Sequence, residues 1–316
     1  MSLTTRLAPT LGSLTLTALM LLALPSHAAK NESKQIKTEY GLAKQEKWFH
    51  ETGELHIVQL TSVDKRWQLH EAYNPQGTLI ERSEHLDKQR HGLFVQQAYD
   101  SLEHTSYRHG KRHGPYHSYD QAGEPMSSGH YTNDQRTGKW VSKNSWGQII
   151  SHYNQQGELH GQQTEFDANG QLLKQSNYKN GMLHGEFIRY ENGQLTEKGH
   201  YQNDRREGEW IETYPLSTRY QGQYRNSYQV GIWHGYSQQG YLVAIIPFDN
   251  EGNYHGVQVR FHDSGALSEI SQYRHGKRHG TQWDYLFGAP YRLEKYQDGK
   301  RVETRDQGEF KRSDFP

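Results

Sequence analysis

The stretch GEFIRYENGQLTEKGHYQNDRREG, residues 185–208, contains one complete copy of a pattern that recurs along the chain. An opening glycine is followed by an aromatic segment, by the turn tripeptide Glu191-Asn192-Gly193, and by a second segment from Leu195 to Tyr201. Asn-Gly readily adopts the positive φ angles of a tight hairpin turn. Leu195 and Tyr201 are six residues apart, an even spacing that places both side chains on one face of a strand. The stretch therefore predicts two short strands joined by a turn.

The opening glycine recurs at intervals of 22 to 25 residues over most of the chain. A period of about 20 to 50 residues is the signature of a repeat array, in which each unit packs against its neighbours. Histidine precedes six of the nine glycines, and the octapeptide YRHGKRHG occurs at both 107–114 and 273–280. The predicted structural glycines are Gly92, Gly114, Gly138, Gly161, Gly185, Gly208, Gly231, Gly256 and Gly280.

The same six-residue step and the same turn signals appear in other units, for example from Leu172 to Tyr178 and from Leu267 to Tyr273. Short turns favour antiparallel neighbours. We therefore predict an all-β fold, an elongated antiparallel β-meander or solenoid of about nine to ten stacked β-hairpin repeats with a period of about 23 residues. The expected divisions are a signal peptide (1–28), an N-terminal lead segment (29–47), degenerate units (48–91), regular units (92–300) and a polar C-terminal tail (301–316).

The first 28 residues have the organisation of an export signal. Arg6 supplies the positive charge, Leu11 to Leu24 form the apolar region, and Ser26-His27-Ala28 is a small-x-small cleavage site. The apolar run is shorter than the ~20 residues needed to span a bilayer. We expect cleavage near Ala28, no transmembrane segment in the mature chain, and a periplasmic or secreted location.

Composition narrows the classes of partner. Lys+Arg and Asp+Glu each number 36, so no basic excess points to nucleic acid. The chain has no Cys, so disulfides cannot stabilise it in an oxidising compartment. Hydrophobic residues make up 32% and aromatics 12%, which suits thin β-structure with one packed face. The alternative of a disordered chain is disfavoured by the strict period.

These features resemble the MORN-repeat variant family of bacteria, whose pattern is Gly-x-aromatic-x-x-Tyr, a glycine turn, Leu, and Tyr-x-Asn-Gly before the next glycine. The spans 161–185, 185–208 and 256–280 match best, and the resemblance extends from about Trp48 to Gly299. It implies an array of β-hairpins. Some members look like antitoxin or immunity components that neutralise a toxin by binding it, but no catalytic residue carries over.

Two units depart from the family pattern. Tyr214-Pro215 replaces the usual glycine turn, and Tyr228-Gln229-Val230 replaces the Asn-Gly step. A bend or an insertion is the expected consequence at this point of the array.

The histidines suggest either metal binding or a structural role. Zinc needs three or four ligands converging at about 2.0–2.1 Å, and stacked repeats could bring histidines together. The alternative is that each histidine occupies one repeat position beside a glycine and hydrogen-bonds the next turn. Because Cys and the HExxH motif are absent, we favour the structural role and predict no metal and no cofactor.

The recurrent aromatics suggest either a core or a glycan or lipid contact. Recurrence at one repeat position favours core stacking, and any aromatics that face a partner are expected at irregular positions. These recurrent residues are Trp140, Trp210, Trp233, Trp283, Phe187 and Tyr116. We find no motif of a hydrolase, a nucleotide-binding loop or a calcium loop, and therefore predict no catalytic residues and no enzyme activity.

The two octapeptides are the best candidates for charged contacts with an acidic partner, although we favour the simpler interpretation that they are solvated turns. The residues concerned are His109, Lys111, Arg112, His113, His275, Lys277, Arg278 and His279. The predicted function is protein–protein recognition by an extended β surface, in its most concrete form an immunity protein that occludes a toxin. The alternative is an envelope structural or glycan- or lipid-binding protein.

Overall fold

The computed structural model describes residues 29–98, 100–214 and 218–314. The expected signal peptide, 1–28, lies outside these ranges. The chain divides into two compact units, with the boundary in the sequence between Leu79 and Ile80. The described residues form 26 strands and one short 3-10 helix, so the all-β prediction is confirmed.

The first unit is a four-stranded antiparallel meander in which each strand pairs with the next. Trp48, Leu60 and Trp67 are buried in it, and Tyr40 stacks on Trp67 with ring centroids 5.0 Å apart. Its strands are β1 (Ala29–Thr38), β2 (Gly41–Phe49), β3 (Leu55–Ser62) and β4 (Trp67–Tyr73). Paired strands therefore occupy the segment that was expected to lead into the array.

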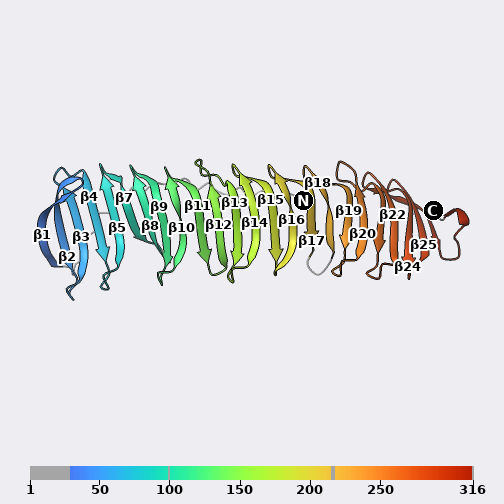
Figure 1. Cartoon of the computed structure of the whole chain (residues 1–316), viewed down its shortest axis with the longest axis horizontal. Coiled ribbons are helices and arrows are strands. Elements are labelled where there is room, and N and C mark those ends of the chain that lie inside the picture. Colours follow the sequence, from blue (N-terminus) through green and yellow to red (C-terminus); the bar gives the residue numbers. More distant parts are fainter. Residues whose placement is uncertain (1–28, 99, 215–217, 315–316) are drawn as a thin grey trace, which may run out of the picture. The chain divides into compact units, whose positions relative to one another are not determined.

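The second unit continues the same chain order, and its strands follow one another side by side (Figure 1). Its elements are β5 (Leu79–Leu86), β6 (Gln89–Arg90), β7 (Gly92–Gln97), β8 (Ser101–Arg108), β9 (Lys111–Asp120), β10 (Pro125–Thr132), β11 (Gln135–Asn144), β12 (Gly147–Tyr153), β13 (Gly161–Asp167), β14 (Leu172–Lys179), β15 (Met182–Glu191), β16 (Gln194–Gln202), β17 (Arg205–Thr213), β18 (Arg219–Arg225), β19 (Tyr228–Tyr236), β20 (Leu242–Phe248), β21 (Gly256–Phe261), β22 (Leu267–Arg274), β23 (Lys277–Arg278), β24 (Gly280–Leu286), β25 (Ala289–Gln297), β26 (Lys300–Asp306) and the 3-10 helix η1 (Arg312–Asp314).

The described residues contain more strands than nine to ten hairpins require, because pairing begins at Ala29 and continues beyond the expected last repeat. Residues 300–306, most of which were assigned to the polar tail, form β26 and pair with β25. At the irregular units pairing also continues, from β17 through β18 and β19 to β20. The connections β17–β18 and β19–β20 are each five residues long, compared with two between β15 and β16, but the interval from Gly208 to Gly231 keeps the 23 residues of the interval before it.

The recurrent glycine has a specific backbone role. All nine predicted glycines have a positive φ, for example 113° at Gly114 and 109° at Gly185. Where the strand pairs on both sides of this glycine, the register shifts beside it, as between Ser176 and Tyr178 opposite β15. An extra residue at positive φ is a β-bulge that only glycine accommodates without strain. The period of the sequence is therefore the period of a bulge.

Consecutive turns at one end of the strands are connected by backbone hydrogen bonds. The amide of Gly181 donates to the carbonyl of Leu159 at 2.8 Å, and the amide of Asp204 donates to that of Leu183 at 3.0 Å. The same bond recurs from Gly110, Asp134, Ser227, Gly276 and Gly299. Each acceptor lies two residues before a repeat glycine, so the bulge and the next turn form one structural unit.

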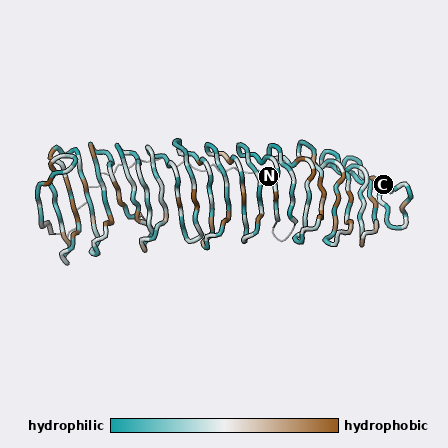
Figure 2. Tube along the Cα trace, in the orientation of Figure 1, coloured by the Kyte–Doolittle hydropathy of each residue, from teal (hydrophilic) through white to brown (hydrophobic). Residues whose placement is uncertain are grey.

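The predicted core aromatics pack as expected. Trp140, Trp210, Trp233, Trp283 and Phe187 are all at most 5% exposed. Apolar residues lie mainly in the middle of the strands and hydrophilic ones at the turns (Figure 2). Tyr116 is half-buried and stacks on Trp140 at 5.5 Å.

Three tryptophans lie flat over a glycine of the preceding strand. Trp140 covers Gly129, Trp210 covers Gly199 and Trp233 covers Gly222, so that a Cβ on any of these glycines would overlap the indole. Each indole Nε1–H donates to a backbone carbonyl at 3.2 Å, as from Trp210 to His200. The pairing explains why small residues occupy the position opposite each of these three tryptophans.

Candidate functional site: the Arg206 cleft and the turn edge

An open cleft of about 580 Å³ lies in the second unit, where the sequence departs from the repeat pattern. It is lined by residues of β15 to β19 and by Gly252. Five of the thirteen lining residues are charged, and Tyr214 and Tyr228 are also among them. These two tyrosines are 56% and 57% exposed, whereas the recurrent aromatics of the core are almost fully buried. We call this feature the Arg206 cleft, after the residue at the centre of its hydrogen bonds.

Arg206 connects two strands and the next hairpin. Its guanidinium forms ion pairs with Glu212 and, at 3.1 Å, with Glu197. It also donates to the Tyr224 hydroxyl at 3.2 Å and lies 4.4 Å over the Trp210 ring. Burial opposes its charge, but hydrogen bonds with Tyr201 and Tyr224 raise the pKa of Arg206 above its ordinary value. Arg206 is therefore a permanent cation fixed by its surroundings.

Two carboxylates of the cleft, Glu197 and Glu212, already have hydrogen-bond partners. Glu212 accepts from Arg206 and, at 2.8 Å, from the Tyr224 hydroxyl. Burial, and next the hydrogen bond to Glu212, raises the pKa of Tyr224 to about 12. Tyr224 stays a neutral donor at physiological pH. The arrangement can position fixed charges and a neutral hydroxyl donor toward a ligand.

Part of this arrangement is a repeat feature that sequence reasoning missed. Arginine stands two residues before five of the nine repeat glycines, and each of these arginines lies over an aromatic ring: Arg90, Arg112, Arg136, Arg206 and Arg278. Arg278 bridges Tyr273 and Tyr296 much as Arg206 bridges Tyr201 and Tyr224. The signal was present in the spacing of arginine to glycine. What distinguishes Arg206 is the open cleft with exposed tyrosines around it.

The first octapeptide forms the turn between β8 and β9. His109 has a φ of 49° and occupies the first position of a two-residue turn, and both it and Lys111 are exposed. Arg112 instead lies 4.2 Å over the Tyr131 ring and donates to Asp134 at 3.3 Å. His113 is half-buried, and its buried Nδ1 has no hydrogen-bond partner among the described residues. Of these four residues, His109 and Lys111 are exposed, whereas Arg112 and His113 are partly buried.

The second octapeptide has the same local geometry. His275, with a φ of 47°, and Lys277 are exposed. The hydrogen bond with Tyr273, and next that with Tyr296, raises the pKa of Arg278 above its ordinary value. His279 is half-buried, and its Nδ1 lies 3.2 Å from Asp298. The octapeptides therefore divide into exposed turn residues and inward arginines that connect neighbouring hairpins.

Three histidines that precede repeat glycines contact the next turn, as the structural interpretation predicts. His160 Nδ1 lies 3.2 Å from Asn180 Oδ1, and His184 Nδ1 lies 3.3 Å from Asn203 Oδ1. The contact of His279 with Asp298 is the third. In the unit at Gly256 the contacted residue is itself a histidine, His275, whose ring centroid is 4.8 Å from that of His255.

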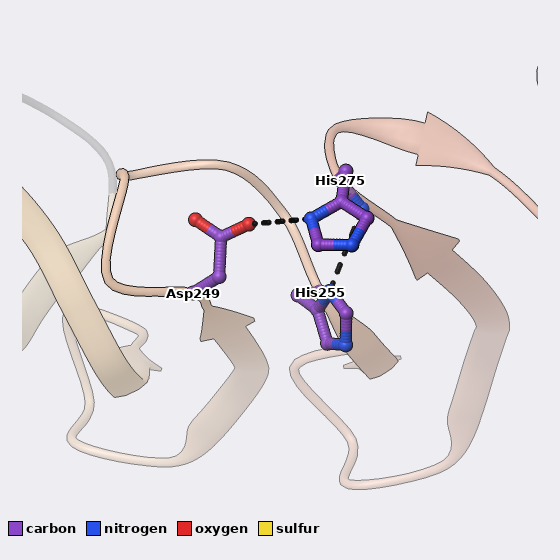
Figure 3. Close-up of side chains that lie close together, drawn as sticks. All are labelled: Asp249, His255 and His275. Carbon is purple, nitrogen blue, oxygen red and sulfur yellow. Dashed lines mark hydrogen bonds and ion pairs between the residues drawn. The ribbon is translucent and has the colours of Figure 1, made fainter.

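Asp249 joins these last two histidines (Figure 3). Its Oδ2 lies 3.3 Å from His275 Nδ1. One ligand atom from each of Asp249, His255 and His275 lies within 4.8 Å of the others, so these three residues could hold a metal ion. The spacing of histidines within the octapeptides did not single out this group, because Asp249 lies outside them.

Other large side chains are exposed at turns. Trp146 is 83% exposed and Phe287 94%, and Tyr241 is 59% exposed in the turn between β19 and β20. The remaining six tryptophans of the chain are at most 5% exposed. Within the described ranges, no helix is long and apolar enough to cross a membrane.

Comparison with known proteins identifies part of the array. A family model described as MORN repeat variant matches residues 159–180 and 183–203. Each match begins two residues before a repeat glycine, at the residue whose carbonyl accepts the next turn's amide, and ends in that turn. No curated protein matches the chain. Residues 159–203 are thus MORN-variant repeats, which confirms the resemblance drawn from their sequence.

Proposed function

We propose that this repeat protein binds another protein, with the Arg206 cleft as the centre of the contact surface. The observation that carries the proposal is the pair of exposed tyrosines, Tyr214 and Tyr228, beside fixed charges where two successive units depart from the repeat pattern. Tyrosine and arginine are enriched among the residues that dominate binding energy at protein interfaces. A surface built of paired strands needs little ordering on binding, so more of the contact energy appears as affinity.

The proposed role is non-enzymatic. Glu197 and Glu212 both pair with Arg206, and this supports charge positioning over proton transfer. Mechanistically, the partner would be occluded by a preformed surface. A standard interface buries about 1,600 Å² in total, so contacts would extend over several strands beyond the cleft.

The most concrete form of the proposal is an immunity protein that neutralises a toxin. The support is the MORN-variant resemblance, and the natural candidate partner is the product of an adjacent gene. The test is the dissociation constant between the full chain and that product. We expect the double variant Tyr214→Ser plus Tyr228→Ser to weaken binding by about tenfold or more, the effect of losing interface hot spots.

The matched control is Tyr241→Ser, because Tyr241 is equally exposed but does not line the cleft. It should leave the dissociation constant unchanged. Equal affinity of wild type and the double variant would contradict the assignment of the cleft. A purified neighbouring toxin that is neither bound nor inhibited would contradict the immunity role.

We also propose export to the periplasm or the medium. The support is the charged, apolar and small-x-small order of residues 1–28. Because β1 begins at Ala29, removal of these residues would leave every described strand intact. We expect intact-mass analysis of the natively expressed protein to give a chain beginning at Ala29 in the periplasmic or extracellular fraction. A cytoplasmic protein that retains Met1 to Ala28 would contradict export.

A second candidate function, glycan binding, is favoured by Trp146, the one exposed tryptophan among the seven. An exposed aromatic face can stack on a sugar ring. If an envelope oligosaccharide binds there, it should change tryptophan emission of the wild type but not of Trp146→Phe. An unchanged wild-type spectrum would remove this candidate.

A further inference from the structure

Asp249, His255 and His275 come from two successive turns at one end of the strands. Asp249 and His255 bound the connection between β20 and β21, and His275 begins the turn after β22. Asp249 Oδ1 is fixed by the backbone amides of Glu251 and Asn253, at 3.0 and 2.9 Å. Its other oxygen, Oδ2, therefore faces His275 in a defined position (Figure 3).

The same structure occurs a second time with different side chains. Asn154 begins the connection between β12 and β13, and its Oδ1 accepts from the amides of Gln156 and Glu158 at 3.0 and 2.9 Å. His160 ends that connection, and Asn180 begins the turn after β14. The positions of Asn154, His160 and Asn180 thus correspond to those of Asp249, His255 and His275.

In the Asn154 group, the side-chain amides of Asn154 and Asn180 form a hydrogen bond with each other. Asn180 Oδ1 lies 3.3 Å from Asn154 Nδ2, which donates to it, and 3.2 Å from His160 Nδ1. Hydrogen bonding between turns therefore needs no carboxylate and no second imidazole. In the later turn, both asparagines are replaced by better metal ligands, Asp and His, at the same backbone positions.

From this comparison we infer that Asp249, His255 and His275 form a binding site for a transition-metal dication of the zinc type. Imidazole nitrogen and carboxylate oxygen are the ligands such ions take in proteins. Two ligands of a tetrahedral ion with bonds of about 2.0–2.1 Å lie about 3.3–3.4 Å apart. His275 Nδ1 and Asp249 Oδ2 already have this separation, at 3.3 Å.

The ring of His255 must supply the third ligand. Its centroid is 4.8 Å from that of His275, and both rings are exposed, so either can rotate without displacing core residues. The backbone amide of His275 approaches His255 Nδ1 at only 3.5 Å, which is a weak bond to exchange for a metal bond. Three protein ligands leave one position open to water or to a donor from a partner.

The test uses the full chain without a polyhistidine tag, stripped with a chelator and titrated with Zn²⁺ by calorimetry. We expect one tight site in the wild type. Asp249→Asn and His275→Asn should each weaken it more than tenfold, because each removes a ligand. Both variants install the residue that the Asn154 group carries, so the turn should keep its fold, and this is checked by an unchanged melting temperature without metal.

Two further measurements distinguish a built site from scattered histidine binding. Zn²⁺ should raise the melting temperature of the wild type, because an ion that binds the native state stabilises it. It should not raise the melting temperature of the variant that combines Asp249→Asn with His275→Asn. The reciprocal change, Asn154→Asp plus Asn180→His, should add a second site. Equal zinc stoichiometry and affinity in wild type and Asp249→Asn/His275→Asn would overturn the inference.

Discussion

Replacing Trp210 with alanine is expected to destabilise the hairpins around β17 by about 3–5 kcal/mol, the range for truncating a buried tryptophan. Trp210 is fully buried and contacts the rings of Phe187, Tyr201 and Tyr224. The cavity cannot close easily, because its floor is the backbone of Gly199. Amide hydrogen exchange of β16 to β18 measures the effect, since repeat arrays open locally.

The partner substitution gives a sharper test of the same contact. Gly199→Ala should cost about 1–3 kcal/mol in the wild type, because the new methyl group overlaps the indole. In the Trp210→Ala background the cost should largely vanish, so the two effects are strongly non-additive. Gly193→Asn is the control, since Gly193 has open space around it and Asn tolerates positive φ. Additive effects would show that the two residues do not pack as described.

Replacing Arg206 with methionine is expected to lower the free energy of unfolding by about 2–3 kcal/mol, the second large effect. Loss of the guanidinium leaves Glu212, whose side chain is 11% exposed, without its cation. Breaking a fully buried pair costs about 3–5 kcal/mol, and the lower figure allows for the quarter of the Arg206 side chain that is exposed to solvent. The change in unfolding free energy by hydrogen exchange of β17 and β18 measures it.

A matched control is next to it in the chain. Arg205 is exposed and makes one hydrogen bond, to Asn226 at 3.3 Å, so Arg205→Met should change stability by less than about 0.5 kcal/mol. Adding Glu212→Gln to Arg206→Met should recover part of the loss, because the unpaired charge is removed. If Arg205→Met and Arg206→Met behave alike, the Arg206 network does not contribute to stability.

Much of the fold could be predicted because its determinants are local. A glycine at positive φ, an Asn-Gly turn and an even spacing of apolar residues each act within a few residues. Each of these patterns is weak evidence in one unit, but its recurrence in successive units makes the prediction of the fold reliable. The burial of Trp140, Trp210 and Trp233 followed from the same reasoning, because one position in each unit must face the packed side.

The sites could not be predicted in the same way. Arg206 meets Tyr224 in the next hairpin, and Asp249 meets His275 in the next turn. These contacts depend on how neighbouring hairpins are registered, and a slip of one residue would send every side chain to the other face.

The sequence by itself therefore determined the repeat, its bulges, its turns and its aromatic core, since each is encoded within one unit of about 23 residues. Only the tertiary structure decided which side chains of different units meet. It placed Arg112 and Arg278 against tyrosines of the next hairpin, opened a cleft around Arg206, and brought Asp249 beside two histidines. The reason is physical: the backbone pairing and the packed aromatic rings set the register between units, and this register fixes side-chain neighbours that no single unit specifies.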